Sequence, residues 1–168
     1  MLSLEDERWA TLQHVYGSAS DIPPVLARLK ASPSIEDRDL WDILWGSLNH
    51  QSEVCDASFA AVPHVIDAIA NHPESAHWHC FAFIASIEVG RVTWSYTIPD
   101  FLVADYAVAW HRIPPLIGRA CIEPRGSLHT RGVLAALAAS QQQPLLAEVL
   151  LEANEAELPE MLEWWQNR

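Results

Sequence analysis

The 168-residue sequence predicts a single all-α domain, residues 1–168, and three observations carry this prediction. Apolar side chains recur every three or four residues along most of the chain, which is the spacing of one helix face. Half of the residues are apolar, enough at this length to bury roughly 70% of the unfolded surface without disulfides or a structural metal. The eleven prolines fall mainly where helices are expected to begin or bend.

The N-terminal part predicts helices over residues 4–16 and 22–30, followed by a third helix after Pro33. Ser34 is the expected N-cap of this third helix, because it stands three residues before Asp37. The next acidic side chains suit the positive end of the helix dipole: Glu36, Asp37 and Asp39. The apolar stripe of the helix is Leu40, Trp41, Leu44, Trp45 and Leu48, and the polar residues 49–52 end it.

The middle of the chain predicts two further helices and one irregular segment. Phe59, Val62, Ile66 and Ile69 share a face of a helix that returns antiparallel to the preceding one, since the turn between them is short. A helix over residues 74–89 is apolar almost all round, so it is expected at the centre, with Gly90 closing it. Later helices are expected over residues 99–111, 113–121, 127–140, 144–153 and 155–166.

Residues 91–98 alternate apolar and polar side chains, which is strand spacing and predicts a short extended connector. Trp94 and Tyr96 lie in this connector. They either cover a helix edge or form an aromatic binding loop, and the sequence leaves both interpretations open.

A weak repeat is marked by proline: apolar, Pro, any residue, then two apolar residues. Its copies begin at residues 22, 62, 113 and 158, so the separations are 40, 51 and 45 residues. The helix-pair unit of HEAT and armadillo proteins has a similar length. The spacing therefore favours a short, irregular HEAT-like α-solenoid of antiparallel helix pairs, with an irregular helical bundle as the alternative.

The residues LWGSLNHQ at 44–51 and ASFAAVPH at 57–64 resemble the core motif of small bacterial HEAT-like repeat proteins. Some proteins of that kind act as immunity proteins that neutralise toxins. The resemblance covers about 30 residues. It implies a helical-repeat fold and, less directly, a protein-binding role.

The formal net charge of −12, with a single lysine, argues against a nucleic-acid-binding surface and favours a basic protein partner. The C-terminal stretch is rich in glutamate, and we expect it to contribute Glu157, Glu160 and Trp164 to a binding surface. Asp37, Asp39 and Asp42 form a second acidic cluster. His50 and Gln51 lie at the tip of the best-defined helix pair, where they either bind a partner or tie down the turn.

The tryptophans divide into two groups. Trp41, Trp45 and Trp78 fall on apolar helix faces and are expected in the core. Trp94, Trp164 and Trp165 are harder to bury, which makes them candidate interface anchors.

A second hypothesis is a small enzyme or metal-binding protein that uses the segment from His72 to Cys80. His72, His77 and His79 are weak candidate metal ligands, because the segment lacks the spacing of known zinc motifs. His77 and His79, two residues apart, are expected on different sides of a helix, and Cys80 is expected in the core. We therefore expect no cofactor.

The sequence lacks phosphate-binding, dinucleotide-binding and nucleophile-elbow motifs, so we expect a binding protein rather than an enzyme. A third hypothesis is a subunit that assembles through its end helices. Three widely spaced cysteines favour a reducing compartment. We expect a cytoplasmic protein, because the sequence shows neither a signal peptide nor a membrane span.

Overall fold

The computed structural model describes residues 1–34 and 36–167 and confirms the all-α fold. Two very short strands, β1 (Gln13–His14) and β2 (Gly17–Ser18), pair antiparallel near the N-terminus. They are flanked by the 3₁₀ helices η1 (Glu7–Ala10) and η2 (Ala19–Asp21). The α-helices are α1 Ile22–Ala31, α2 Arg38–Leu48, α3 Asp56–Asn71, α4 Trp78–Thr93, α5 Asp100–His111, α6 Ile113–Ala120, α7 Ser127–Ser140, α8 Pro144–Glu152 and α9 Leu158–Gln166.

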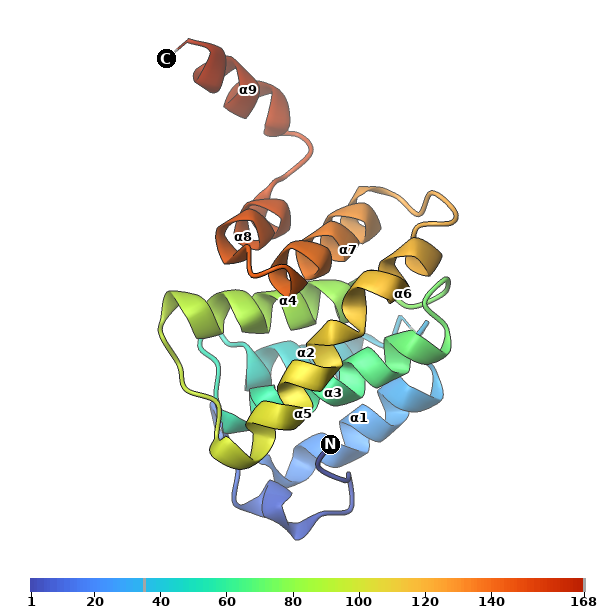
Figure 1. Cartoon of the computed structure of the whole chain (residues 1–168), viewed down its shortest axis with the longest axis vertical. Helices are drawn as coiled ribbons and strands as arrows, with labels where there is room; N and C mark the ends of the chain where they lie inside the picture. Colours follow the sequence, from blue (N-terminus) through green and yellow to red (C-terminus); the bar gives the residue numbers. More distant parts are fainter. Residues whose placement is uncertain (35, 168) are drawn as a thin grey trace.

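The core is built around α3 and α4, the two longest apolar segments. Helix α4 packs against α3 on one side and against α7 and α8 on the other, as its nearly all-round apolar surface predicts. Figure 1 shows α1, α3 and α4 in successive layers, with α7 and α8 beyond α4 and with α5 and α6 crossing in front. The buried core runs from Leu2 to Ala147 without reaching α9. A HEAT-like solenoid stays a prediction.

The proline repeat marks helix starts in three of its four copies. A proline occupies the second position of α1, α6 and α9, where the missing N–H would have no helical partner. Pro63 instead lies inside α3, as its eighth residue. The copies therefore do not occupy equivalent positions along their helices.

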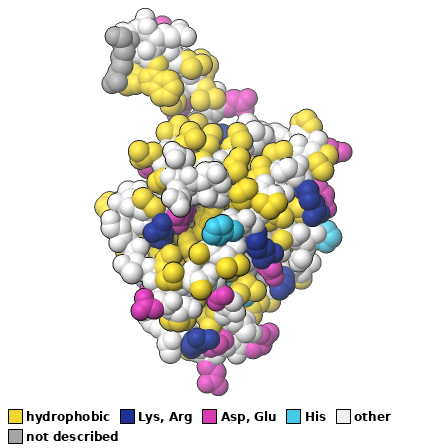
Figure 2. All heavy atoms as spheres, in the orientation of Figure 1, with side chains coloured by type: hydrophobic (Ala, Val, Ile, Leu, Met, Phe, Trp, Pro, Cys, Tyr) yellow, Lys and Arg dark blue, Asp and Glu magenta, His cyan; other side chains and the backbone are white. Residues whose placement is uncertain are grey.

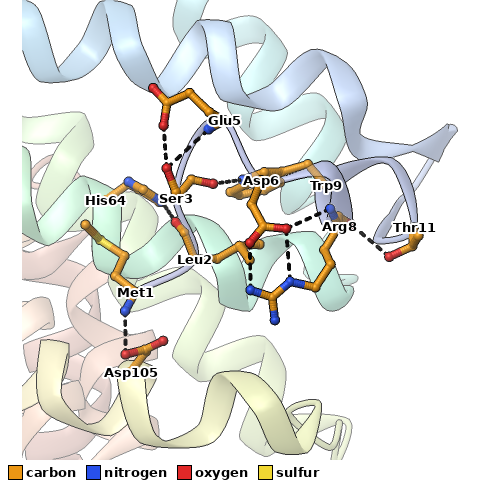
Figure 3. Close-up of polar contacts among 10 residues, drawn as sticks. All are labelled: Met1, Leu2, Ser3, Glu5, Asp6, Arg8, Trp9, Thr11, His64 and Asp105. Carbon is orange, nitrogen blue, oxygen red and sulfur yellow. Dashed lines mark hydrogen bonds and ion pairs between the residues drawn. The ribbon is translucent and has the colours of Figure 1, made fainter.

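The expected helix over residues 4–16 is wrong. The segment instead forms η1 and a hairpin, because local side-chain bonds compete with helix formation there. Asp6 caps η1 by accepting from the Arg8 amide at 2.9 Å and also binds the Arg8 guanidinium (Figure 3). Gly17 then adopts a φ of +128°, which glycine tolerates at a tight hairpin.

The first residues are tied to the helical body by polar contacts. His64 of α3 donates from Nε2 to the carbonyl oxygen of Leu2 at 2.8 Å, and Trp9 donates from Nε1 to that of Ser3 at 2.9 Å. The terminal amine lies 2.5 Å from an Asp105 carboxylate oxygen on α5. Figure 3 shows Leu2 meeting His64 of α3 and the terminal amine meeting Asp105 of α5, whereas the Trp9 bond lies within the N-terminal segment. The segment is thus docked without being helical.

Three further local predictions need correction. Asp37, rather than Ser34, caps α2 by accepting from the Leu40 amide at 3.1 Å, because the helix begins at Arg38. Helix α4 begins at Trp78 rather than at residue 74, and Gly90 does not close it. The expected connector over residues 91–98 is helical as far as Thr93 and forms no strand beyond it.

Candidate protein-binding surfaces

Helix α8 has an outer face that nothing in its own packing explains. Ala147 is its buried residue, and it points into the layer formed with α4 and α7. Leu145, Leu146 and Val149 are exposed, Leu145 by 75%. Apolar side chains of this size are normally withdrawn from water, so a contiguous exposed group of them marks a candidate interface.

Helix α9 extends this apolar surface. Leu158, Met161, Leu162 and Trp165 follow the spacing of one helix stripe, yet α9 has no buried residue. Figure 1 shows α9 projecting beyond α8, and Figure 2 shows hydrophobic side chains gathered around α7 and α8 and on the projecting helix. We name the segment from Pro144 to Gln166 the C-terminal arm. Its exposed stripe suits docking against a partner.

The C-terminal arm also concentrates negative charge. No lysine or arginine occurs between residues 132 and 167, whereas this stretch contains Glu148, Glu152, Glu155, Glu157, Glu160 and Glu163. Basic side chains elsewhere pair with carboxylates: Arg8, Arg28, Lys30, Arg38, Arg91, Arg112 and Arg119. The arm therefore carries six negative charges and no positive one, and it includes the predicted residues Glu157, Glu160 and Trp164.

A second surface brings together the turns at one edge of the helical stack. The α2–α3 turn reaches the end of α4, because a Cβ on Gly90 would lie 2.7 Å from the Ser52 carbonyl oxygen. His50 packs edge-on against Tyr16 of the hairpin, with ring centroids 6.1 Å apart. Trp94 follows α4 at the same edge and is 62% exposed.

Gln51 and Tyr96, two further residues predicted to bind a partner, also lie in these turns. Gln51 has a φ of +51° within the α2–α3 turn, and Tyr96 is 37% exposed after α4. The structure thus collects His50, Gln51, Trp94 and Tyr96 from two separate turns. Tyr16 belongs with them, and its position within an expected helix hid it from sequence reasoning.

The third predicted set, Asp37, Asp39 and Asp42, lies at the start of α2. Asp37 serves the fold, because it caps the helix and also binds the Arg28 guanidinium. Asp42 pairs with Arg38 across 3.6 Å, and Asp39 is exposed in the first turn. This set therefore forms a surface separate from the C-terminal arm.

Beside the start of α2, the start of α4 stacks its aromatic side chains. His77 and His79 have ring centroids 5.0 Å apart and nearly parallel planes, so the expectation that they lie on different sides of a helix is wrong. The reason is that His77 is the N-cap, with extended backbone angles, and precedes the helix. His79 also stacks on Trp78 at 3.7 Å and on Trp41 at 4.8 Å.

The tryptophan side chains in this stack differ in burial. Trp41 is buried as predicted, whereas Trp45 and Trp78 keep part of their surface exposed and so are only partly in the core. Trp45 donates from Nε1 to Nδ1 of His79 at 2.9 Å. The two residues are far apart in sequence, and no local pattern indicates this contact.

Burial governs the ionisation of this cluster. It lowers the pKa of His79 to about 4, with a further lowering from His77. Burial also lowers the pKa of His77. Both imidazoles are therefore neutral at neutral pH, which agrees with Nδ1 of His79 accepting a hydrogen bond.

The metal hypothesis receives no geometric support from the part of the chain that the structure describes. There, no group of three or more His, Cys, Asp or Glu side chains is placed to hold a metal ion. His72 is exposed and lies 3.8 Å from a Glu74 carboxylate oxygen, apart from the stack. Cys80 is buried as expected, and burial raises the pKa of its thiol to about 12.

Sequence reasoning also missed a partly buried polar group on α4 and α5. Glu88 accepts from the Tyr106 hydroxyl at 2.8 Å and from the Arg91 guanidinium at 2.6 Å. Burial raises the pKa of Tyr106, which stays protonated and keeps donating. These contacts fasten α5 to α4, and only the i, i+3 spacing of Glu88 and Arg91 signals them in the sequence.

Comparison with known protein families, curated proteins and solved structures finds no match to this chain. Among the described residues, no helix combines the length and the apolar character that crossing a bilayer requires. The exposed apolar and acidic surfaces of the chain are therefore the features that bear on its function.

Proposed function

We propose that this chain is a protein-binding module that occludes a basic partner protein through the C-terminal arm. The observation that supports it most is the coincidence of charge and apolar surface. Six glutamates with no intervening basic residue share the arm with exposed leucine, valine and tryptophan side chains. Charge complementarity raises the rate of association, and buried aromatic and aliphatic anchors supply most of the affinity.

Helix α9 of the arm can act as a recognition helix, because the packing of the core does not bury its apolar stripe. The stripe of Leu158, Leu162 and Trp165 has no counterpart in the core, since α9 buries none of its residues. A nine-residue helix is marginal alone in water, so docking would order it further. The partner would present an apolar groove with a basic rim.

The class of function that fits this surface is an immunity-type inhibitor or an adaptor acting in the cytoplasm. An enzyme that binds nucleic acid carries a cationic face, and an acidic arm would cover it. The resemblance of residues 44–51 and 57–64 to HEAT-like immunity proteins points the same way. The proposal requires no catalytic residue and no cofactor in this chain.

The test is co-purification from source cells with two matched triple variants. One variant neutralises the arm, with Glu157→Gln, Glu160→Gln and Glu163→Gln. The control removes the same charge from exposed glutamates elsewhere, with Glu7→Gln, Glu53→Gln and Glu123→Gln. Partners are identified by mass spectrometry at low and at moderate salt.

We expect the intact chain and the control variant to retain one basic protein at low salt and to release it at moderate salt. The arm variant should lose it at both. Equal retention by the two variants would contradict a role of the arm, and recovery of the intact chain with no partner would contradict the proposed function.

A further inference from the structure

A recess of about 350 Å³ opens between the start of α2 and the start of α4. Five aromatic rings line it, and they are Trp41, Trp45, His77, Trp78 and His79. Glu36, Arg38 and Asp42 lie at its rim, and Leu128 of α7 adds an apolar side chain. Neither the fold nor the C-terminal arm accounts for so many rings around an open space.

We propose that this recess binds an organic cation, an alkylammonium or guanidinium group, held by the aromatic rings and by the carboxylates of Glu36 and Asp42. A cation within about 6 Å of an aromatic ring is attracted by the ring's electron-rich face, most strongly when the ring is tryptophan. Trp45, Trp78 and His79 keep part of their surface open. The ring composition therefore selects for positive charge.

The histidines must be neutral for this role, and their hydrogen bonds agree with the neutral state. The indole N–H of Trp45 points at Nδ1 of His79, and a protonated imidazole has no lone pair to accept that bond. His77 likewise presents Nδ1 to the backbone amide of His79. Both rings therefore add aromatic surface without adding positive charge.

The carboxylates at the rim affect the pKa values of the stacked histidines. Glu36 raises the pKa of His77 and Asp42 raises that of His79, in each case against the larger opposite effect of burial. These are long-range electrostatic effects on the rings themselves, so both carboxylates lie near enough to attract a cation placed there.

Three positive features oppose a cation, and none is strong. Arg125 lowers the pKa of His77, but by less than Glu36 raises it. The Arg125 guanidinium donates to the Glu74 and Ala76 carbonyl oxygens instead of lining the recess. Arg38 lies at the rim, but its contact with Asp42 is long, and its side chain is 90% exposed, so the pair is weak. The N-terminus of α4 carries a partial positive charge, but His77 caps it through the His79 amide. Removing Arg38 should therefore improve the site.

This inference does not rest on the proposed function, because the recess lies apart from the arm residues. The cation could be a free small molecule or the side chain of a bound protein. The chemistry that the recess recognises is the same for both sources, and they differ only in what else they contact.

The test titrates the full chain with choline and with methylguanidinium while the indole N–H resonances of Trp41 and Trp45 are followed by NMR. Each resonance is assigned with a Trp→Phe variant. The neutral controls are 3,3-dimethyl-1-butanol, which has the shape of choline, and methylurea. We expect saturable shifts with the cations and none with the neutral compounds.

Substitutions at the rim give the matched comparison. Glu36→Gln and Asp42→Asn should each weaken cation binding about threefold, and Arg38→Gln should strengthen it by a similar factor. Asp39→Asn is the control, because Asp39 belongs to the same helix but does not line the recess. Equal shifts with cation and neutral compound, or no shift with either, would overturn the proposal.

Short peptides that contain one trimethyllysine or one arginine distinguish the two sources. Affinity at least tenfold above that of the free cation would assign the site to a protein side chain. Equal affinity would assign it to a small molecule. A loss of partner binding by the arm variant leaves these titrations unchanged, so the two proposals fail independently.

Discussion

At the scale of single residues, His79 makes the stability of the fold depend on pH. Burial lowers its pKa from 6.5 to about 4. The unfolded chain therefore takes up this proton at a higher pH than the folded chain does. Protonation of His79 in the unfolded chain lowers the unfolding free energy. This loss is absent above about pH 6.5 and grows as the pH falls from there toward 4, so acid destabilises the fold in this window.

His79→Phe removes the titration and retains an aromatic ring in the stack. We expect the loss of unfolding free energy between pH 7 and pH 5 to be smaller in this variant by about 1–2 kcal/mol. Urea unfolding at the two pH values measures it. His72→Gln, at an exposed histidine, serves as the control. An unchanged pH dependence in His79→Phe would show that burial in the stack does not lower the pKa of His79.

Asp37 illustrates how local chemistry sets a helix boundary. Sequence reasoning placed acidic residues at the start of α2 but chose Ser34 as the cap, since both residue types cap helices. The two side-chain contacts of Asp37, with the Leu40 amide and with Arg28, decide between them.

We expect Asp37→Ala to lower the unfolding free energy by about 1 kcal/mol, the usual cost of losing a cap. Asp39→Ala, in the exposed first turn, should lower it by less than about half as much. Chemical denaturation compares the two variants, and equal losses would show that Asp37 contributes only its charge.

At the scale of elements, the helices were predictable where an apolar stripe repeats. The stripe from Leu40 to Leu48 predicts α2, and the all-round apolar surface of the next segments predicts that α4 is central. Residues 4–16 have similar apolar spacing but form η1 and a hairpin, because local side-chain bonds such as that of Asp6 with the Arg8 amide compete with helix formation. The spacing of apolar residues does not reveal these bonds.

Two glycines report how closely the elements approach one another. A Cβ on Gly90 would lie 2.7 Å from the Ser52 carbonyl oxygen and 3.1 Å from Val54, where the α2–α3 turn meets α4. A Cβ on Gly46 of α2 would meet no atom within 4 Å.

Alanine at the two positions should therefore have opposite effects. Gly90→Ala should destabilise the fold by about 1–3 kcal/mol, because a backbone atom must move. Gly46→Ala should stabilise it by about 0.5–1 kcal/mol, because glycine is a poor helix former. Thermal and urea unfolding measure both, and a neutral Gly90→Ala would show that the turn does not press on α4.

At the scale of the whole molecule, apolar periodicity along most of the chain predicted the all-α class, and composition predicted the acidic character. It did not predict how the candidate residues are distributed. Asp39, Trp94 and Glu160 lie on three separate surfaces, because their positions depend on how helices pack rather than on local sequence. The stacking of His79 on Trp41, which is distant in the sequence, was unpredictable for the same reason.

The end of α8 divides the molecule into a packed core, which includes α8, and the helix α9, which buries no residue. Because α9 buries no residue, a chain that ends after Ala153 should unfold within about 2 °C of the intact chain. Thermal unfolding followed by circular dichroism checks this. A markedly lower midpoint would show that α9 belongs to the core.

The most direct measurement is the affinity of the co-purifying basic protein for the intact chain and for the chain ending at Ala153, each at several salt concentrations. The account predicts tight binding by the intact chain that weakens steeply with salt, and binding at least a hundredfold weaker by the folded truncated chain. Equal affinity of the two chains would contradict recognition through α9, and no dependence on salt would contradict recognition through the acidic charge of the arm.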